Sequence, residues 1–437
     1  MSIKRNVFIF ILMIVMLNFL LSDLLLSNIF KEDVIDKINP HRSQQYNKII
    51  GLHINEYQEY LLNNFPLDRL YMLNDIIYFI VTPTEYKKVL NLGIKPFNIK
   101  KRPINQHIGR ISNTDFGYGN SDYNGAYHSY YETKDILNEL QEKYPQQAKV
   151  FSIGKSVENR DINIIQITNF KTKVGNVDNV DKKNIFIVGC HHAREWISVE
   201  IPLLFAKFIL EQQENDNIKK ALNGANIYIL PILNPDGLEF SIHNYRYWRK
   251  NRKYNGNFIW GVDLNRNYGY MWGINNEGSS PFSKSEAYRG TEPFSEPETE
   301  ALRRFLLDNP PDGTISYHNY SQLILMPWGY KYEKPESYEE LKEIASEMSK
   351  RIYEVNGRVY NYGGAEALYL VNGELNDWIY GRFKIPAFTI ELPPTSSIIS
   401  GGFFTSEEEI KLSFEENLPA LLYFINYFID KDYKKQT

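Results

Sequence analysis

Apolar segments with the length of strands alternate with helix-like segments from Tyr127 to Phe428, and this alternation constrains the fold more than any other feature. The run Ile185–Val188 is entirely apolar, which is typical of a parallel strand buried on both faces. Ile197–Leu210 follows it with the length of a helix. Further strands are expected at residues 150–153, 162–168, 227–233, 314–317 and 387–390, and further helices at residues 295–307, 337–353 and 406–428. We therefore predict an α/β fold, with helices on both faces of one mixed, mostly parallel, twisted sheet.

One helix start carries a recognisable local signal. Ser295 and Glu298 have the spacing of a capping box, in which the two side chains each accept a hydrogen bond from the other's backbone N–H. We expect the helix at residues 295–307 to begin there.

The composition removes several classes of protein and of site. Hydrophobic residues make up 43% and charged residues 23%, as in an ordinary folded protein. The chain has 49 Lys and Arg against 53 Asp and Glu, so it lacks the basic excess that nucleic-acid binding needs. The single cysteine, Cys190, excludes an intramolecular disulfide and Cys-rich metal sites. A metal bound by this chain would therefore have His and carboxylate ligands.

The first 27 residues have the pattern of an export signal. Lys4 and Arg5 precede the apolar run Val7–Leu21, which Asn18 interrupts. A membrane-spanning helix needs about 20 apolar residues, so residues 1–27 are predicted to be a secretory signal peptide. No small-residue cleavage site follows, so an uncleaved N-terminal anchor stays open. We expect the protein to be secreted, or anchored at the cell surface if the signal is retained, with no other membrane contact.

Two segments separate this signal from the alternating region. Short apolar runs at Ile49–Ile54 and Ile76–Val81, with a helix expected after Thr82, indicate a small α+β domain at residues 28–99. Residues 100–125 combine basic residues with Gly, Asn and Ser and show no periodicity. Such a stretch marks an exposed linker with a protease-processing site.

The residues that can carry chemistry stand at the ends of predicted strands. His192 and Glu195 form an H-x-x-E pair in the turn after Ile185–Val188, while His318 and Glu391 end two other strands. Ligands of open α/β sheets bind beyond the carboxyl ends of the strands, so these side chains are candidates to converge. Two His and one Glu with an open fourth position form a catalytic zinc set. The H-x-x-E pair alone is weak, because about one such match is expected by chance and a capping or surface ion pair would also explain it.

The order of motifs resembles that of the zinc metallocarboxypeptidases of the carboxypeptidase A/B type, and its pattern is most similar to bacterial carboxypeptidase T. The matching segments are Gly154–Arg160, His192–Glu195, Asn234–Gly237, Trp248–Lys250, Gly261–Asn267, His318–Ser321, Tyr369, Asp377–Trp378 and Phe388–Leu392. The resemblance implies the fold of that family, with a catalytic domain at residues 126–430. It also implies that residues 28–99 are a prosegment, which an activating protease would release.

The resemblance implies one Zn²⁺ per chain, held by His192, Glu195 and His318. His191, one residue away, is the competing candidate ligand. Asp263 would accept the second ring N–H of a ligand histidine. In the same comparison, Glu391 would be the general base and Arg249 would stabilise the oxyanion.

The resemblance also implies a site for the C-terminal residue of a peptide. Asn265 and Arg266 would bind the terminal carboxylate, since an Arg fork can donate two parallel hydrogen bonds. Tyr369 would close over the terminal residue. Asn376 stands where the family uses an apolar residue or Asp, and Glu374 adds an acidic group nearby. The full set of implied substrate-binding residues is Arg194, Asn265, Arg266, Tyr320, Tyr369, Glu374 and Asn376.

We therefore expect an exported metallocarboxypeptidase that acts on the C-termini of peptides and proteins. Leu325, Leu368, Val371 and Thr389 would make its specificity pocket partly apolar, so with Glu374 we predict mixed specificity for apolar, aromatic and basic C-terminal residues. The alternatives are a peptidoglycan-peptide hydrolase of the same fold, a zinc amidase or deacylase that acts on small acylated amino acids, and a binding module without activity.

Overall fold

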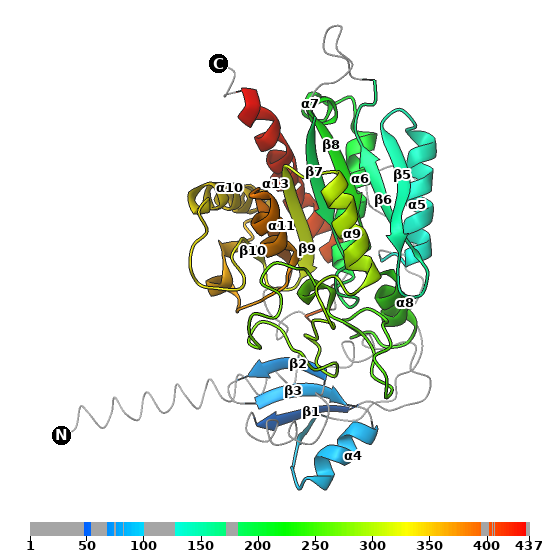
Figure 1. Ribbon diagram of the computed structural model, residues 1–437, viewed down its shortest axis with the longest axis vertical. Coiled ribbons are helices and arrows are strands. Elements are labelled where there is room, and N and C mark those ends of the chain that lie inside the picture. Colours follow the sequence, from blue (N-terminus) through cyan, green and yellow to red (C-terminus); the bar gives the residue numbers. More distant parts are fainter. Residues whose placement is uncertain are drawn as a thin grey trace, which may run out of the picture.

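An eight-stranded mixed sheet forms the centre of the main domain (Figure 1), in the order β11-β10-β12-β9-β7-β8-β6-β5. Its strands are β5 (Ala148–Lys155), β6 (Asp161–Ile167), β7 (Lys183–Val188), β8 (Ala225–Leu230), β9 (Gly313–Asn319), β10 (Leu323–Leu325), β11 (Asn361–Gly363) and β12 (Ala387–Leu392). The four central strands, β12, β9, β7 and β8, are parallel. Antiparallel β6 and β5 extend one side, and β10 pairs antiparallel with β12 on the other. The predicted fold class is confirmed.

The structure, a computed structural model, describes residues 48–53, 68–73, 76–81, 83–99, 127–171, 182–394, 402–403, 405 and 407–433. The predicted signal at residues 1–27 and the linker at residues 100–125 lie outside these ranges. Among the described residues, no helix has both the length and the apolarity needed to cross a membrane.

Helices cover both faces of the large sheet. Five pack on one face: α5 (Tyr130–Lys143), α6 (Ile197–Glu211), α7 (Asp216–Gly224), α10 (Tyr338–Asn356) and α13 (Glu407–Tyr433). The other face is covered by α9 (Pro297–Asp308) and α11 (Leu375–Phe383). Residues Ile185–Val188 of β7 are all apolar because both faces of the strand are buried there: Ile185 and Ile187 face the first core, while Phe186 and Val188 face the second.

Two local predictions differ from the structure. Strand β8 ends at Leu230 rather than at Leu233, and Pro231, which follows, has no N–H to continue the ladder. The capping box predicted for α9 is wrong. The N-cap of α9 is Glu296 and no side chain caps it. The Ser295 hydroxyl instead donates to Glu296 Oε1 at 2.9 Å, and its oxygen accepts from the side-chain amide of Asn267 at 3.0 Å. A capping box does form at α5, between Ser129 and Glu132.

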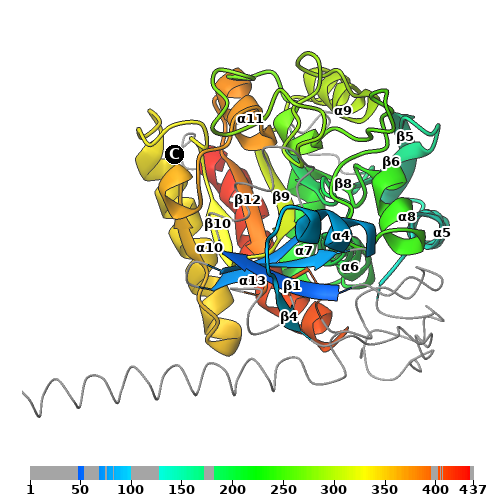
Figure 2. The same cartoon turned by 90° about the horizontal axis from the view of Figure 1, so that it is seen from below.

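A smaller antiparallel sheet precedes the main domain in sequence. Its order is β2-β3-β1-β4, formed by β1 (Lys48–His53), β2 (Asp68–Leu73), β3 (Ile76–Val81) and β4 (Phe97–Ile99), with helix α4 (Pro83–Asn91) after β3. Figures 1 and 2 both show this sheet on the side to which the carboxyl ends of β7, β8 and β9 point. The domain limits drawn from the sequence stay predictions.

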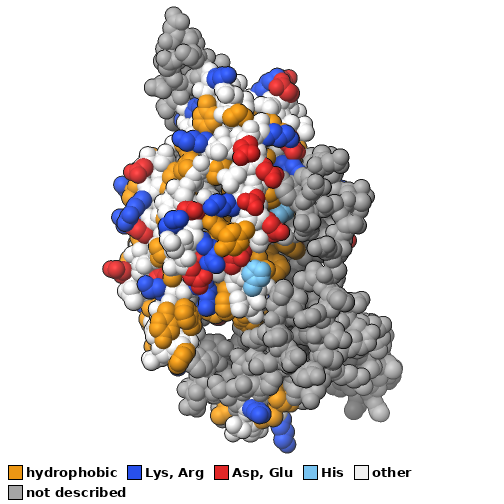
Figure 3. Space-filling view, turned by 90° about the vertical axis from the view of Figure 1, so that its right-hand side faces the viewer, with side chains coloured by type: hydrophobic (Ala, Val, Ile, Leu, Met, Phe, Trp, Pro, Cys, Tyr) orange, Lys and Arg blue, Asp and Glu red, His pale blue; other side chains and the backbone are white. Residues whose placement is uncertain are grey.

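The surface over α5 and its neighbours is mixed in character (Figure 3). Basic and acidic side chains are interspersed across the coloured part of this face, with apolar side chains between them. This distribution matches the nearly balanced charge of the chain.

Candidate active site

The turn between β7 and α6 brings the H-x-x-E pair to the carboxyl edge of the sheet. Gly189 begins this turn, and a Cβ atom there would lie 2.0 Å from the Ser198 carbonyl oxygen, so glycine is required by the close backbone approach. Cys190 follows with φ +53° and is fully buried, and burial raises the pKa of its thiol. The Glu195 N–H then donates to the His192 carbonyl at 3.1 Å, which tightens the turn and turns both side chains the same way.

Strands β9 and β12 supply the other two strand-end residues. The two strands are parallel and in register, so His318 lies beside Glu391 and Ser316 lies beside Thr389. Residues in register on neighbouring strands project from the same face of a sheet. His318 and Glu391 therefore reach the same side of the carboxyl edge as the β7–α6 turn.

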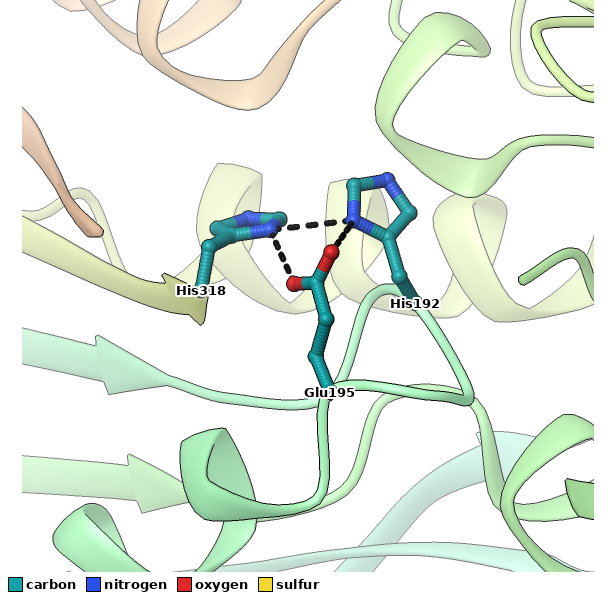
Figure 4. A group of neighbouring side chains, drawn as sticks. All are labelled: His192, Glu195 and His318. Carbon is teal, nitrogen blue, oxygen red and sulfur yellow. Dashed lines mark hydrogen bonds and ion pairs between the residues drawn. The ribbon is translucent and has the colours of Figure 1, made fainter. Parts of the chain in front are cut away.

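His192, Glu195 and His318 converge on one point (Figure 4). His192 Nδ1 lies 2.8 Å from Glu195 Oε1, and His318 Nδ1 lies 2.9 Å from Glu195 Oε2. The two Nδ1 atoms are 3.1 Å apart. All three side chains are buried, and within the described part of the chain this is the group of His, Cys, Asp and Glu able to hold a metal ion.

The chemistry of this donor set fits Zn²⁺. Two imidazole nitrogens and a carboxylate face a common point, and such neutral nitrogen and anionic oxygen donors are catalytic zinc ligands. Burial by itself would raise the pKa of Glu195, but the two imidazoles hold the pKa of its carboxyl below the usual range. Glu195 is thus held as the carboxylate that a metal needs.

His191, the competing ligand candidate, points away from this group. Its Nε2 lies 2.8 Å from the hydroxyl of Tyr268, and its Nδ1 lies 3.3 Å from Ser316 Oγ. His191 is fully buried, and burial lowers the pKa of its ring well below the usual range. Of the two adjacent histidines, it is therefore His192 that faces Glu195 and His318.

Asp263 and Arg249 form a second layer beside His192. Asp263 Oδ1 lies 3.1 Å from His192 Nε2, the ring nitrogen that faces away from Glu195. Arg249 donates from Nε and Nη2 to Asp263 Oδ2 at 3.0 and 2.9 Å. Burial would raise the pKa of Asp263, but the guanidinium of Arg249 holds it well below the usual range. Asp263 therefore holds both the imidazole ring of His192 and the guanidinium of Arg249 in place.

A short hairpin joins Arg249 to Asp263. The Asn251 N–H donates to the Val262 carbonyl at 3.0 Å, and the Val262 N–H donates back to Asn251 Oδ1 at 2.8 Å. The side-chain amide of Asn251 donates to Glu296 at 2.7 Å and to Glu298 at 3.2 Å. These buried bonds fix the spacing of the two arms that carry Arg249 and Asp263.

We call His192, Glu195 and His318 the metal group. A cavity of about 220 Å³ extends from it. It is lined by His192, Arg194, Glu195, Arg249, Asn265, Arg266, His318, Asn319, Tyr320, Ser321, Leu325, Leu368, Tyr369, Val371, Glu374, Thr389, Glu391 and Phe403. Of the implied substrate-binding residues, Asn376 alone does not line the cavity. It lies behind the wall, where its amide donates to Thr389 Oγ1 at 2.9 Å.

Arg266 is a buried cation that forms no ion pair with the described residues. Its side chain is 4% exposed and Nη1 donates to the Asn265 carbonyl at 2.8 Å, while Nε has no hydrogen-bond partner. In the part of the chain that the structure describes, Arg266 makes no ion pair. Tyr369, on the same cavity, is 53% exposed.

Glu374 lies in the cavity wall rather than in solvent. It is 9% exposed, and its Oε1 occupies the position next to Gly329, where a Cβ atom would lie 2.1 Å from it. Burial raises the pKa of Glu374 to about 7, against the opposing effect of Arg266. The wall is otherwise formed in part by apolar side chains such as Leu325, Leu368 and Val371.

Three lining residues were not singled out from the sequence. Asn319 and Ser321 flank Tyr320, and their inclusion in the motif His318–Ser321 was the available signal. Phe403 carries no such signal, since it stands outside every motif. It stacks on the guanidinium of Arg194, whose Cζ lies 4.3 Å from the ring centroid.

The chain and its fold have known counterparts. Residues 133–420 match the model of the zinc carboxypeptidase family, Peptidase_M14. The chain is 33% identical over 357 residues to carboxypeptidase B2 of Rattus norvegicus. The aligned region covers 79% of this chain and 82% of that relative.

Two solved structures are similar as well. A crystal structure of thrombin-activatable fibrinolysis inhibitor aligns with a TM-score of 0.72 at 26% identity, over 88% of this chain and 99% of that one. The bovine form of that protein, in complex with tick carboxypeptidase inhibitor, aligns with a TM-score of 0.62 at 32% identity, over 70% of this chain and 98% of that one. The chain therefore belongs to the zinc carboxypeptidase family and is a zinc-dependent metallocarboxypeptidase.

Proposed function

We propose that this carboxypeptidase acts outside the cell and removes apolar, aromatic and basic residues from the C-termini of peptides and proteins. The observation that carries the proposal is that a buried guanidinium and a buried carboxyl group line the same cavity. Arg266 forms no ion pair with the described residues and its Nε has no hydrogen-bond partner among them, and Glu374 stands in a partly apolar wall. A cavity with these features suits a terminal carboxylate together with a side chain that is apolar or cationic.

In this proposal His192, Glu195 and His318 hold the Zn²⁺. When bound, the ion lowers the pKa of water and polarises a carbonyl as a Lewis acid. Asp263 accepts the N–H of His192 at Nε2, which keeps the Nδ1 lone pair directed at the metal position.

Glu391 is proposed as the general base. It lines the cavity beside His318, and its carboxylate takes a proton from the attacking water and later delivers that proton to the leaving amine. Arg249 lines the same cavity and stays cationic, so it is suited to stabilise the oxyanion that forms on the scissile carbonyl.

The remaining cavity residues are proposed to hold the end of the peptide. Arg266 and Asn265 bind the terminal carboxylate, and Tyr369, whose ring is half exposed, closes over the terminal residue. Arg194 and Tyr320 contact the peptide further from its end. Asn376 acts through Thr389, to which it donates. The bovine neighbour bound to a tick carboxypeptidase inhibitor supports a peptide or protein as the partner.

The test is hydrolysis of blocked dipeptides that end in Leu, Phe, Lys or Arg. The wild-type protein should contain zinc and cleave all four, whereas Glu391→Gln should keep the zinc and lose about 10²–10⁴-fold in kcat. Full activity in Glu391→Gln would reject the mechanism. Peptidoglycan peptides and small acylated amino acids belong in the same panel, and a clear preference for either would favour one of the alternative functions.

We also propose that residues 28–99 inhibit the enzyme until a protease cuts within residues 100–125, after residues 1–27 have directed export. The position of the small sheet beyond the carboxyl ends of the central strands supports this order (Figures 1 and 2). Limited trypsin treatment of the exported protein should raise kcat/KM. Equal activity before and after cleavage would instead make the small domain a permanent accessory.

A further inference from the structure

A row of buried polar side chains lies behind the metal group. We call it the polar row, and its members are Tyr268, His191 and Ser316. All three are buried at 1% exposure or less. The row begins at the hydroxyl of Tyr268, passes through both ring nitrogens of His191 at 2.8 and 3.3 Å, and reaches Ser316 Oγ. It ends at His318, whose Nε2 lies 3.1 Å from that same oxygen.

The ring of His318 has a defined orientation. Its Nδ1 faces Glu195 Oε2 at 2.9 Å and His192 Nδ1 at 3.1 Å, so Nδ1 is the nitrogen directed at the metal position. A neutral imidazole carries its hydrogen on one nitrogen, so a ligand lone pair on Nδ1 places that hydrogen on Nε2. The acceptor available to this N–H is the hydroxyl oxygen of Ser316.

His191 supports the same ring in two ways. Its imidazole stacks on that of His318, with the centroids 5.1 Å apart and the planes at 23°. Its Nδ1 faces Ser316 Oγ, and a hydroxyl can accept one hydrogen bond while it donates or accepts another. Tyr268, at the far end, fixes the orientation of the His191 ring through Nε2.

We propose that Ser316 and His191 are positioning residues for zinc, which hold His318 in the tautomer and orientation that a ligand needs. This inference rests on the proposed role of His318 as a ligand. The polar row then does for His318 what Asp263 does for His192, with a neutral hydroxyl in place of a carboxylate. It also accounts for a buried histidine next to the ligand histidine that is not itself directed at the metal.

The test is the zinc affinity of the full chain, measured by competition with a chromophoric chelator after the metal has been removed. Ser316→Ala should weaken zinc binding about 10- to 100-fold, the range usual for loss of such a partner. Ser316→Thr keeps the hydroxyl and should stay close to wild type. His191→Phe keeps the stacked ring, and should weaken binding less than Ser316→Ala.

A coupling measurement separates positioning from general destabilisation. If His191 acts through the Ser316 hydroxyl, His191→Phe should have no further effect on zinc affinity in the Ser316→Ala background. The visible spectrum of the Co²⁺-substituted protein should change in Ser316→Ala, because the ligand ring is no longer held.

Thr314→Val is the matched control. Thr314 lies two residues before Ser316 on the same face of β9 and is fully buried, and its hydroxyl has no hydrogen-bond partner among the described residues. It should bind zinc as the wild type does. If Ser316→Ala and Thr314→Val have equal affinities and spectra, the proposal is overturned. If the wild-type protein itself binds no zinc, the proposed function fails first.

Discussion

At the scale of single residues, the site is built from charges that the protein leaves without a full set of partners. Arg266 is the clearest case, because a buried guanidinium normally has a carboxylate beside it. Here the described residues provide a carbonyl group from Asn265 and no ion pair. The carboxyl groups of Asp263 and Glu374 interact with this cation electrostatically without pairing with it, so an anion that enters the cavity can still form the direct bonds that Arg266 lacks, which is a physical basis for selecting a free C-terminus.

Arg266→Lys should therefore weaken the use of substrates with a free C-terminal carboxylate. A lysine ammonium cannot form the two parallel bonds of a guanidinium, and we expect kcat/KM to fall about 10- to 100-fold. Arg303→Lys on α9 changes the same atoms in an arginine that is 39% exposed and paired with Glu300, and should have no effect. An equal loss on peptides with an amidated C-terminus would contradict the assigned role.

Glu374 makes a prediction about pH. Because its pKa is raised to about 7 by burial, its side chain is neutral below that pH and anionic above it. The ratio of kcat/KM for C-terminal Arg over C-terminal Leu should therefore rise about tenfold from pH 6 to pH 8, following the ionised fraction. The ratio should be low and flat in Glu374→Gln, and unchanged in Glu366→Gln. A ratio that does not vary with pH in the wild type would contradict this.

At the scale of elements, two segments bring the three proposed metal ligands together. The β7–α6 turn carries His192 and Glu195, and the end of β9 carries His318. The turn can form only because Gly189 lets the backbone pass close to the start of α6 and to Pro231. The register of β9 with β12 then places Glu391 next to His318 without any further loop.

Gly189→Ala should consequently be severe. The new Cβ would lie 2.0 Å from one backbone oxygen and 2.9 Å from another, so the turn and the first turn of α6 must separate. We expect a loss of about 3 kcal/mol in the free energy of unfolding, or failure to fold, by urea denaturation. Gly357→Ala is the control, since Gly357 has a left-handed backbone conformation, with φ +77°, but no atom lies within 4 Å of an added Cβ. It should cost about 1 kcal/mol, and equal losses would contradict the role of close approach.

At the scale of the whole molecule, the metal group joins segments that are far apart in the chain. His192 and Glu195 precede His318 by more than a hundred residues, and the ion would tie β7, α6 and β9 into one unit. The two cores on either side of the sheet already hold these elements together. Zinc is thus expected to add to the stability of a folded domain rather than to create it.

Removal of zinc should lower the Tm of the full chain and leave it folded. A ligand present at about 1,000 times its Kd adds about 4 kcal/mol to the free energy of unfolding. Scanning calorimetry with and without chelator measures the shift, which added Zn²⁺ should reverse and added Mg²⁺ should not, because Mg²⁺ prefers oxygen ligands. In His318→Ala the chelator should have a much smaller effect. An unfolded metal-free protein would contradict the expectation.

The sequence by itself determined the class of fold and the residues that meet at the sheet edge. Ile185–Val188 of β7 are all apolar because both faces of the strand are buried there, and that pattern can be read without coordinates. The residues proposed for the chemistry follow or end parallel strands: His192, Glu195, His318 and Glu391. The carboxyl ends of parallel strands lie at one edge of a sheet whatever the conformation of the connecting loops.

Only the tertiary structure decided the finer questions, since each depends on partners distant in sequence. The choice between His191 and His192 turns on Tyr268 and Asp263, more than seventy residues away. Ser295 and Glu298 have the spacing of a capping box, yet Ser295 bonds to the Glu296 side chain and to Asn267 instead. Glu374 faces the cavity because it packs against Gly329. Spacing along the chain records local geometry, whereas the direction of a buried side chain is set by what the fold places opposite to it.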